Sequence, residues 1–482
     1  MIGLWLAAGA LLLSACFKDK GNYSYTTLND VLISMPDTLL VKQGAQLEVN
    51  PVVSQLLNKE EDRLTYEWVV TVPGRTASDS TLEILATTRD LKVEINYQSG
   101  RYYPLNLKIT DNASGIVYRK QSLMRVTTDF EPGYLLLEND GLTADLSFVN
   151  TGRDEILRQV FSTANPGITL PVSAHHVYVC DYPLYTASVG STSWTNAPGT
   201  ITAVFGSEEG YILDYRTMRV ATPYSLFFTT PPAVVAPGHF QMDSEQPPVF
   251  LSINNGQLHR IYFARGQALL GDAYLAPDDK GYFLAPHCAN TSSVSLYYDQ
   301  RNKRFLTENY LNLYLAPVVK GGSSGFDPAN VSGQLLGMGL GKDWGDFYAV
   351  FKDETGDDCY FYTFSFTNAL KVDKISSSPG FANSPAILFS TLRDQVYYAD
   401  GNKLYLYDIA ANFSRVLYEF PAGENTSALM LQDGNTLVAA TWDGAEGRLY
   451  KLGLDASGSV IGGAYQKKYT GFGKIIHLKY KK

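Results

Sequence analysis

The stretch QVYYADGNKLYLYDIAANFSRVLYEF, residues 395–420, contains the repeating unit that decides the fold. Two Tyr-rich segments, QVYYAD and KLYLYD, are separated by Gly-Asn, and a third alternating segment follows a second turn. Apolar alternation with a period of two residues, interrupted by Gly and Asn, is typical of antiparallel strands joined by tight turns. The stretch therefore predicts three consecutive strands of one sheet.

The same unit recurs from Gly133 onward. Seven copies align on their third strand: ADLSFVN (144–150), YILDYRTMRV (211–220), QLHRIYFA (257–264), VSLYYDQRNKRFL (294–306), CYFYTFSF (359–366), KLYLYDI (403–409) and RLYKLGLD (448–455). Their spacing of roughly 35 to 65 residues brackets that of a four-stranded blade with variable loops. We expect an all-β chain in which residues 129–482 form a seven-bladed β-propeller. The alternative is a second and a third β-sandwich.

The two ends of this repeat region predict how the ring closes. The segment GYLLLEND (133–140) leads directly into ADLSFVN, so the first blade lacks an innermost strand. The final segment, KIIHLKY (474–480), has no blade of its own. Pairing of the two would complete the first blade and cover both strand edges. The sandwich alternative leaves the final strand without a partner.

Residues 30–128 have a different pattern, with short alternating segments separated by Pro, Gly, Asn and Asp. Roughly seven strands in about 100 residues are typical of a PKD- or Ig-like β-sandwich. Trp68 lies in the alternating segment LTYEWVV, where such sandwiches bury an aromatic side chain. We expect Trp68 in the core.

The N-terminus has the features of a lipoprotein leader. Residues 1–15 contain the apolar run IGLWLAAGALLL, which is too short to span a bilayer but suits a signal peptide. Leu13-Ser14-Ala15-Cys16 follows and is similar to a bacterial lipobox, with Cys16 as the lipidation site. The polar residues 16–29 would be a lipidated tether, which anchors the protein without spanning the membrane.

The order of lipobox, CFKDKGNYSY tether, PKD-like sandwich and PGYLLLENDGLTADLSFV resembles the PKD-like family of surface lipoproteins. The resemblance is strongest at residues 13–33 and 131–149. It implies an accessory lipoprotein of the outer membrane, exposed at the cell surface. Such a protein works beside a TonB-dependent transporter and its lid lipoprotein in the capture of oligosaccharide or peptide. The resemblance assigns Cys16 as the lipid site and assigns no ligand residue.

Composition and motifs narrow the possible chemistry. The net charge of -9 disfavours nucleic acid as a partner, because phosphates require a basic surface. Apart from Cys16, the chain has three well-separated cysteines, for which we expect buried thiols: Cys180, Cys288 and Cys359. No nucleophile elbow, P-loop, HExxH or dinucleotide fingerprint is present in the sequence. We expect no cofactor, no metal and no enzymatic activity.

Two further patterns contain residue types that bind metals, but their spacing does not predict a metal site. The adjacent His175 and His176 would point to opposite faces of a strand, and the other histidines are scattered. The acidic stretch 353–358, DETGDD, lacks the ligand spacing of an EF-hand loop. We interpret it as a hairpin turn between FYAVFK and CYFYTF.

Ligand contacts are expected on one face of the propeller. The longest predicted connections between blades are 265–281, 307–333 and 367–384, and long loops in a compact repeat often carry function. They contain the candidate ligand-binding aromatics Tyr274, Tyr310, Tyr314, Phe326 and Phe381. Trp442, at a turn between second and third strands, would share that face. Trp194 and Trp344 lie on connections between first and second strands, where they would dock a partner protein.

Three functions are compatible with this organisation. The first is a binding module that captures oligosaccharide or peptide through aromatic stacking. The second is a structural subunit of the transporter complex that has no ligand of its own. The third is a propeller-type glycan hydrolase or lyase with paired carboxylates from different blades. The sequence favours the first.

Overall fold

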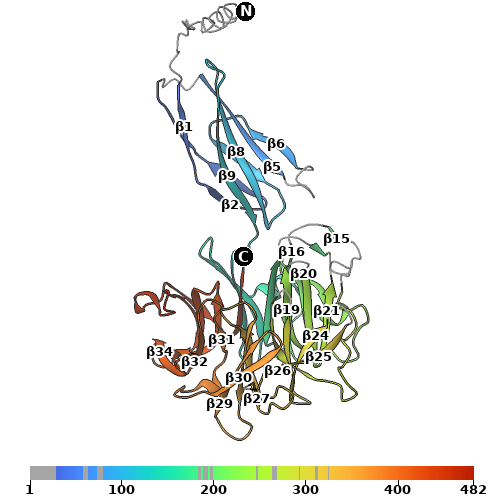
Figure 1. The fold of residues 1–482 in the computed structure, drawn as a ribbon. Coiled ribbons are helices and arrows are strands. Elements are labelled where there is room, and N and C mark those ends of the chain that lie inside the picture. The colour runs from blue at the N-terminus through green and yellow to red at the C-terminus, as the bar shows by residue number, and fades with distance from the viewer. Residues whose placement is uncertain are drawn as a thin grey trace, which may run out of the picture. The chain divides into compact units, whose positions relative to one another are not determined.

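The computed structural model describes residues 29–482, except for 58–62, 73–79, 183–185, 188–193, 196–198, 246–247, 263–268, 292–293, 310–312 and 324. The described secondary structure is almost entirely β-strand (Figure 1). The chain divides into an N-terminal unit, Met1–Asn96 with Tyr102–Arg125, and a C-terminal unit, Tyr97–Arg101 with Val126–Lys482. Within the described residues, no helix is long and apolar enough to cross a membrane.

The strands of the N-terminal region form one larger sheet and two strand pairs. The larger sheet has the order β2 (Thr38–Lys42), β9 (Val117–Thr127), β8 (Arg101–Asp111), β5 (Leu64–Val72) and β6 (Thr81–Ala86). The pairs are β1 (Val31–Ser34) with β4 (Val52–Gln55), and β3 (Ala45–Val49) with β7 (Leu91–Ile95). More strands form than predicted, because LLVKQGAQLEVNPVV is divided among β2, β3 and β4. Gly44, with φ of 79°, turns the chain between the first two.

Trp68 is the centre of the N-terminal core, as predicted. It lies in β5 opposite Leu107 of β8, and both side chains are fully buried. The indole Nε1 donates to the backbone oxygens of Thr88 and Arg89, at 3.1 and 3.3 Å. The polar end of the ring is therefore satisfied where its apolar body is buried.

In its described residues, the C-terminal unit contains seven sheets of three to five strands, besides one two-stranded pair. The first three are β12 (Glu155–Leu157), β11 (Ala144–Asn150), β10 (Gly133–Asn139) and β39 (Ile475–Lys481); β13 (His176–Tyr182), β16 (Gly199–Phe205), β17 (Gly210–Asp214) and β18 (Val220–Pro223); and β19 (Pro237–Glu245), β20 (Pro248–Asn254) and β21 (Gln257–Tyr262). The fourth and fifth are β22 (Leu284–Asn290), β23 (Ser295–Asp299), β24 (Arg304–Asn309) and β25 (Tyr314–Pro317); and β27 (Gln334–Leu340), β28 (Asp346–Lys352), β29 (Cys359–Ser365), β30 (Asn368–Lys374) and β26 (Val319–Lys320).

The sixth and seventh sheets complete the set. They are β31 (Leu388–Phe389), β32 (Gln395–Asp400), β33 (Lys403–Asp408) and β34 (Phe413–Glu419); and β35 (Asn425–Gln432), β36 (Thr436–Trp442), β37 (Gly447–Gly453) and β38 (Lys467–Phe472). Short elements lie between strands: the pair β14 (Thr186–Ala187) and β15 (Trp194–Thr195), helix α2 (Val160–Ala164), and the 3-10 turns η3 (Tyr224–Leu226), η5 (Phe381–Asn383) and η6 (Ile461–Gly463).

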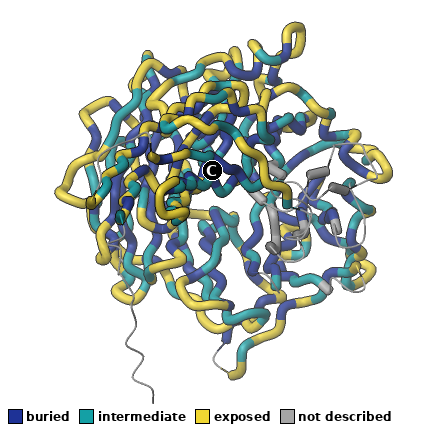
Figure 2. Tube along the Cα trace, turned by 90° about the horizontal axis from the view of Figure 1, so that it is seen from above, coloured by how far each residue is buried: buried dark blue, intermediate teal, exposed yellow. Residues whose placement is uncertain are grey.

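One edge strand of each sheet contacts the corresponding strand of the next sheet, and these contacts form a closed cycle. The order is β39, β13, β19, β22, β27, β31, β35 and again β39. We call these seven strands the inner strands. The chain end that follows β39 lies near the middle of the C-terminal unit (Figure 2). The unit is therefore β-propeller-like.

Strand β39 joins the last part of the chain to the first sheet. It pairs antiparallel with β10, with Tyr134 opposite Tyr480 and Leu136 opposite Leu478. The backbone N–H of Asn139 also donates to the carbonyl of Lys474, at 2.9 Å. The predicted pairing of the final strand with 133–140 is confirmed, and it covers the free edge of β10.

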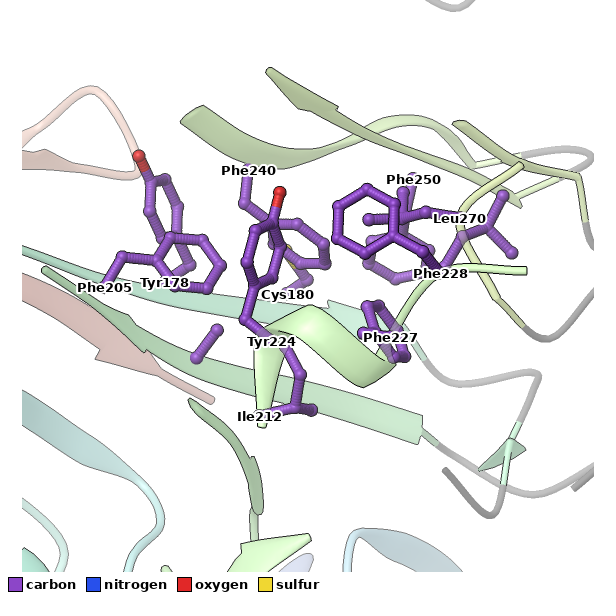
Figure 3. Close-up of a cluster of buried hydrophobic side chains, with 12 residues drawn as sticks. Tyr178, Cys180, Phe205, Ile212, Tyr224, Phe227, Phe228, Phe240, Phe250 and Leu270 are labelled. Carbon is purple, nitrogen blue, oxygen red and sulfur yellow. The ribbon is translucent and has the colours of Figure 1, made fainter. Parts of the chain in front are cut away.

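Each interface between neighbouring sheets contains its own hydrophobic cluster, and the seven clusters run around the whole cycle. The cluster between the second and third sheets is rich in aromatic rings, including Tyr178, Phe205, Tyr224 and Phe240 (Figure 3). Ring centroids of Phe205 and Tyr224 lie 4.7 Å apart. Strands with both faces in such interfaces carry continuous apolar runs, as in YYA of β32 and VAA of β36.

Two details of the predicted repeat are wrong. Six of the seven aligned segments match the third strand of their sheet, but VSLYYDQRNKRFL (294–306) begins one strand early, with the second strand β23, and contains only the start of the third strand, β24. Strands β25, β26 and β30 lie in the connections predicted at 307–333 and 367–384. These outer strands were missed because one face meets solvent, so that NALKVDK of β30 carries few apolar side chains.

Candidate functional site

A groove of about 550 Å³ lies where β35 and β39 run side by side. Its walls come from the start of β35, the end of β36, the residues before β39 and the segment before β31. The lining residues are Pro385, Gly423, Asn425, Thr426, Ser427, Trp442, Asp443, Gly444, Lys474 and Ile476. All these segments are connections between sheets or turns between second and third strands, together with the strand ends beside them. The groove therefore occupies the face on which the sequence predicts ligand contact.

Trp442 is partly exposed at the end of β36, beyond five buried residues of that strand. The next residue, Asp443, fixes the turn: its carboxylate accepts the backbone N–H groups of Ala445 and Glu446, at 2.9 and 2.8 Å. It also pairs with Arg448, at 2.7 Å. These two backbone hydrogen bonds, and the Arg448 guanidinium after them, lower the pKa of Asp443 to about 2. The indole thus projects from an ordered turn.

A buried carboxylate supports the same corner from behind. Glu424 Oε2 accepts hydrogen bonds from the hydroxyls of Tyr450 and Thr441, at 2.7 and 3.1 Å. Its other oxygen lies 3.5 Å from Arg448 Nε and 3.7 Å from Lys468 Nζ. Burial, followed by the hydrogen bond to Glu424, raises the pKa of Tyr450. The network connects the residue before β35 to β36, β37 and β38.

Polar groups of the groove have unused hydrogen-bonding capacity. The hydroxyl oxygens of Thr426 and Ser427 are buried and have no hydrogen-bond partner among the described residues. Lys474 is exposed and lines both this groove and an adjacent hollow of about 360 Å³. That hollow is lined by Glu138, Asn139, Asp140, Thr143, Ala144, Asp145, Gln159, Gly473 and Lys474. An indole face beside hydroxyl, amide, carboxylate and ammonium groups can recognise a polar molecule that has an apolar face.

Three of the other predicted aromatics do not join Trp442. Tyr274 and Phe381 are 3% and 2% exposed, so neither offers a free ring face, and both positions are corrected to core residues. Tyr274 belongs to the cluster between the third and fourth sheets, and the Phe381 ring lies 4.5 Å from that of Tyr398. Phe326 is half-buried, with its ring 4.9 Å from Tyr362 and 5.2 Å from Phe364. Packing between sheets occupies these three rings.

The remaining candidates lie elsewhere or outside the described residues. Cys16 and Tyr310 fall outside them, so lipidation of the first and ligand contact by the second stay predictions. Tyr314 is half-buried in β25. Trp344 lies between β27 and β28, as predicted, and is 68% exposed. Trp194 lies in β15, between β13 and β16.

Two other predictions are confirmed. Cys180, Cys288 and Cys359 are buried thiols that form no disulfide with one another. The acidic stretch 353–358 is the turn between β28 and β29. Among the residues that the structure describes, no group of three or more His, Cys, Asp or Glu side chains is arranged to hold a metal ion.

Sequence reasoning missed a cluster of histidines, which it treated as scattered. The rings of His176 and His477 lie 4.4 Å apart, and His175 lies 4.9 Å from His176. Tyr178 links this pair to His239, with ring distances of 6.4 Å to His477 and 5.8 Å to His239. A usable signal existed: His176, His239, His287 and His477 each lie at or before the middle of an inner strand.

Comparisons with solved structures find similar folds at low identity. A quinonprotein alcohol dehydrogenase-like protein from Bacteroides thetaiotaomicron is 14% identical, with 96% of this chain and 98% of that chain covered and a TM-score of 0.42. A protein from Lactobacillus plantarum is 11% identical, with 73% and 99% covered and a TM-score of 0.46. Regucalcin, a calcium-binding protein from Agrobacterium tumefaciens, is 12% identical, with 46% and 70% covered and a TM-score of 0.28. At such low sequence identities and TM-scores, the similarity to these structures says nothing about the activity of this protein.

No curated protein matches the chain. The model of one protein family matches its N-terminal part, from the predicted lipidation site at Cys16 through β12 and α2. That segment includes the motifs at 16–33 and 131–149 on which the sequence resemblance rests. Residues 16–170 thus match the PKD-like family.

Proposed function

We propose that the C-terminal unit is a seven-bladed β-propeller that captures a ligand in the Trp442 groove. The closed cycle of inner strands and the hydrophobic cluster at each of the seven interfaces support the propeller. The groove supports the binding role, and it is the observation that carries the proposal. Its place beside turns and sheet connections suits recognition, because such segments vary without disturbing the core.

An oligosaccharide fits the groove better than an apolar peptide. The indole offers one flat apolar surface, which suits the apolar face of a sugar ring. Around it lie the amide of Asn425, the hydroxyls of Thr426 and Ser427, and the charged ends of Asp443 and Lys474. Sugar hydroxyls can donate to and accept from these groups, whereas an apolar side chain would leave them unpaired.

The wider assignment rests on the sequence. We propose that Cys16 carries a lipid which anchors the protein to the outer membrane at the cell surface, beside a TonB-dependent transporter and its lid lipoprotein. The family match at 16–170 supports a PKD-like N-terminal region and leaves the anchor and the transporter as proposals. A purely structural subunit is the main alternative. A glycan hydrolase or lyase is a third possibility, and release of products from a polysaccharide by the purified protein would establish it.

The Trp442→Ala variant tests the ligand site. We expect calorimetry to show glycan binding by the unmodified protein, and at least about tenfold weaker binding by the variant, because a stacked aromatic often dominates a small binding site. Trp344→Ala removes an exposed indole far from the groove residues in sequence and should leave the affinity unchanged.

The outcomes separate the alternatives. Unchanged affinity in Trp442→Ala would overturn the site. Flat calorimetry with glycan and peptide panels, together with co-purification with the transporter, would favour the structural subunit. Binding confined to the peptide panel would replace the oligosaccharide with a peptide. Protection of the C-terminal unit from protease added to intact cells would contradict exposure at the surface.

A further inference from the structure

Five basic side chains gather on four consecutive inner strands. His176 lies on β13, His239 on β19 and His287 on β22, while His477 and Lys479 lie on β39. We call these five residues the inner basic cluster. Each of the five side chains is neither fully buried nor fully exposed. The strands follow one another in the cycle, so side chains 300 residues apart in the chain come together.

The contacts between these side chains are direct. Beyond the His176–His477 ring contact, Lys479 Nζ lies over the ring of Tyr178, 6.0 Å from its centroid. His287 lies on β22, which contacts β19 in the cycle, and its electrostatic interaction contributes to lowering the pKa values of His176 and His239. Burial contributes most to lowering the pKa of His239 and of His287 to about 4, and that of His176 to about 3.

Within the described residues, no carboxylate neutralises the cluster. In the described part of the chain, none of the five side chains forms an ion pair or a hydrogen bond with Asp or Glu. Lys479 has no ion-pair partner there, and burial lowers the pKa of its ammonium group. The other titratable groups that act on the cluster are His175 and Cys180. Neither is a carboxylate.

The hydrogen bonds leave donors and acceptors of the rings unused. His477 Nδ1 accepts the backbone N–H of Val177, at 3.3 Å, so its proton lies on Nε2. His239 Nε2 donates to Gln241 Oε1, at 2.8 Å. His176 Nδ1 is buried and has no partner among the described residues. An unpaired ammonium and unpaired ring nitrogens in a partly buried place are costly unless a ligand pairs with them.

We propose that the inner basic cluster binds a carboxylate group of a ligand. Lys479 supplies the fixed positive charge, and the imidazoles supply N–H donors that gain protons when the anion arrives. A carboxylate accepts several such hydrogen bonds at once, and each is strengthened by charge. The site lies on β39, β13, β19 and β22, apart from the Trp442 groove between β35 and β39. It does not depend on the groove being a ligand site.

Calorimetry with glucuronate at pH 6 tests the proposal. We expect saturable binding that weakens at least about tenfold in Lys479→Met, which keeps the length of the side chain and removes the charge. Lys371→Met is the matched control, because Lys371 is exposed on β30 and removal of its charge should leave the affinity unchanged. Binding of trialanine tests whether the cluster takes the carboxylate of a peptide as well as that of an acidic sugar. Glucose is the probe without a charge.

Melting temperatures distinguish loss of ligand binding from poor folding of the Lys479→Met variant. Since Lys479 carries an unpaired charge, Lys479→Met should melt at or above the temperature of the unmodified protein without ligand. Glucuronate should raise the melting temperature of the unmodified protein and leave that of the variant unchanged. No saturable binding of either carboxylate, equal affinity in Lys479→Met, or equal binding of glucose would overturn the proposal. Binding of glucuronate in a Trp442→Ala protein would show that the two sites are separate.

Discussion

Glu424 illustrates how much depends on one residue of the candidate site. It is 7% exposed and is the common partner of Thr441, Tyr450 and Arg448. Removing one member of a buried charged network leaves the others desolvated and unpaired. A change at Glu424 therefore acts on stability and on the position of the turn after Trp442.

We expect Glu424→Ala to lower the free energy of unfolding of the C-terminal unit by about 3 kcal/mol. Urea unfolding followed by tryptophan fluorescence measures the loss. Glu446→Ala is the matched control: Glu446 also pairs with Arg448, at 2.9 Å, but its side chain is 39% exposed, so its removal should cost under about 1 kcal/mol. Equal losses in the two variants would contradict a supporting role for Glu424.

The sequence could identify Trp442 but not its setting. An indole followed by Asp and Gly indicates an exposed turn, and the structure places Trp442 in the groove. Tyr274 and Phe381 look similar in sequence, since they also lie near turns, yet both are buried between sheets. The sequence shows that an aromatic residue lies near the end of a strand. Whether its ring is exposed to solvent depends on how the neighbouring sheet packs against it.

At the scale of the element, β39 has the largest share in closing the cycle. It pairs with β10 in the first sheet and packs beside β13 and β35, so it contacts both neighbouring sheets. Leu478 of β39 is 2% exposed in the cluster between the seventh and first sheets. Loss of this side chain would leave a cavity at the closing interface.

Leu478→Ala should destabilise the C-terminal unit by about 2 to 5 kcal/mol, because a buried leucine loses both its transfer free energy and its packing. The midpoint of urea unfolding is the measurement. Lys482→Ala lies just beyond the strand at an exposed position and serves as the control. If Leu478→Ala unfolded at the same urea concentration as the control, β39 would not hold the unit closed.

Second strands such as β32 and β36 were predictable because both of their faces are buried. The apolar runs of β32 and β36 stand out in any reading of the sequence. Outer strands such as β30 bury only isolated residues, so their sequence resembles a connection. The pairing of β39 with β10 was predictable for a different reason: one sheet lacked a strand and one strand lacked a sheet.

At the scale of the whole molecule, the clustering of the histidines could not be predicted from the sequence. His176 and His477 are separated by 300 residues and meet only when the cycle closes. Local sequence patterns do not predict contacts between residues so far apart in the chain. Their repeated position at or before the middle of inner strands becomes meaningful once those strands are known to be neighbours.

The histidines give the C-terminal unit a specific pH dependence. In the folded state the pKa values of His239 and His287 are about 4, against 6.5 for an ordinary histidine. Between these values the unfolded chain binds protons and the folded protein does not, so stability falls as the pH decreases from about 6.5 toward 4. Each histidine contributes up to about 1.4 kcal/mol per pH unit.

Thermal unfolding between pH 6.5 and 5 checks this, because most carboxylates remain ionised in that range. We expect a falling melting temperature, and a shallower fall in His239→Asn, which no longer titrates. A melting temperature that is constant across the range, or an equal slope in the variant, would contradict the sign derived from burial of the rings.

The closure by β39 also has a consequence for synthesis. Glu138, in β10, and Gly473, just before β39, are joined by a hydrogen bond across 335 residues of chain. At about 5 to 20 residues per second, β10 has to wait roughly 20 to 70 s after leaving the ribosome before its partner exists. During that time the edge of β10 can pair with another nascent chain. The delay therefore favours binding by a chaperone that keeps the unfinished protein apart from its copies.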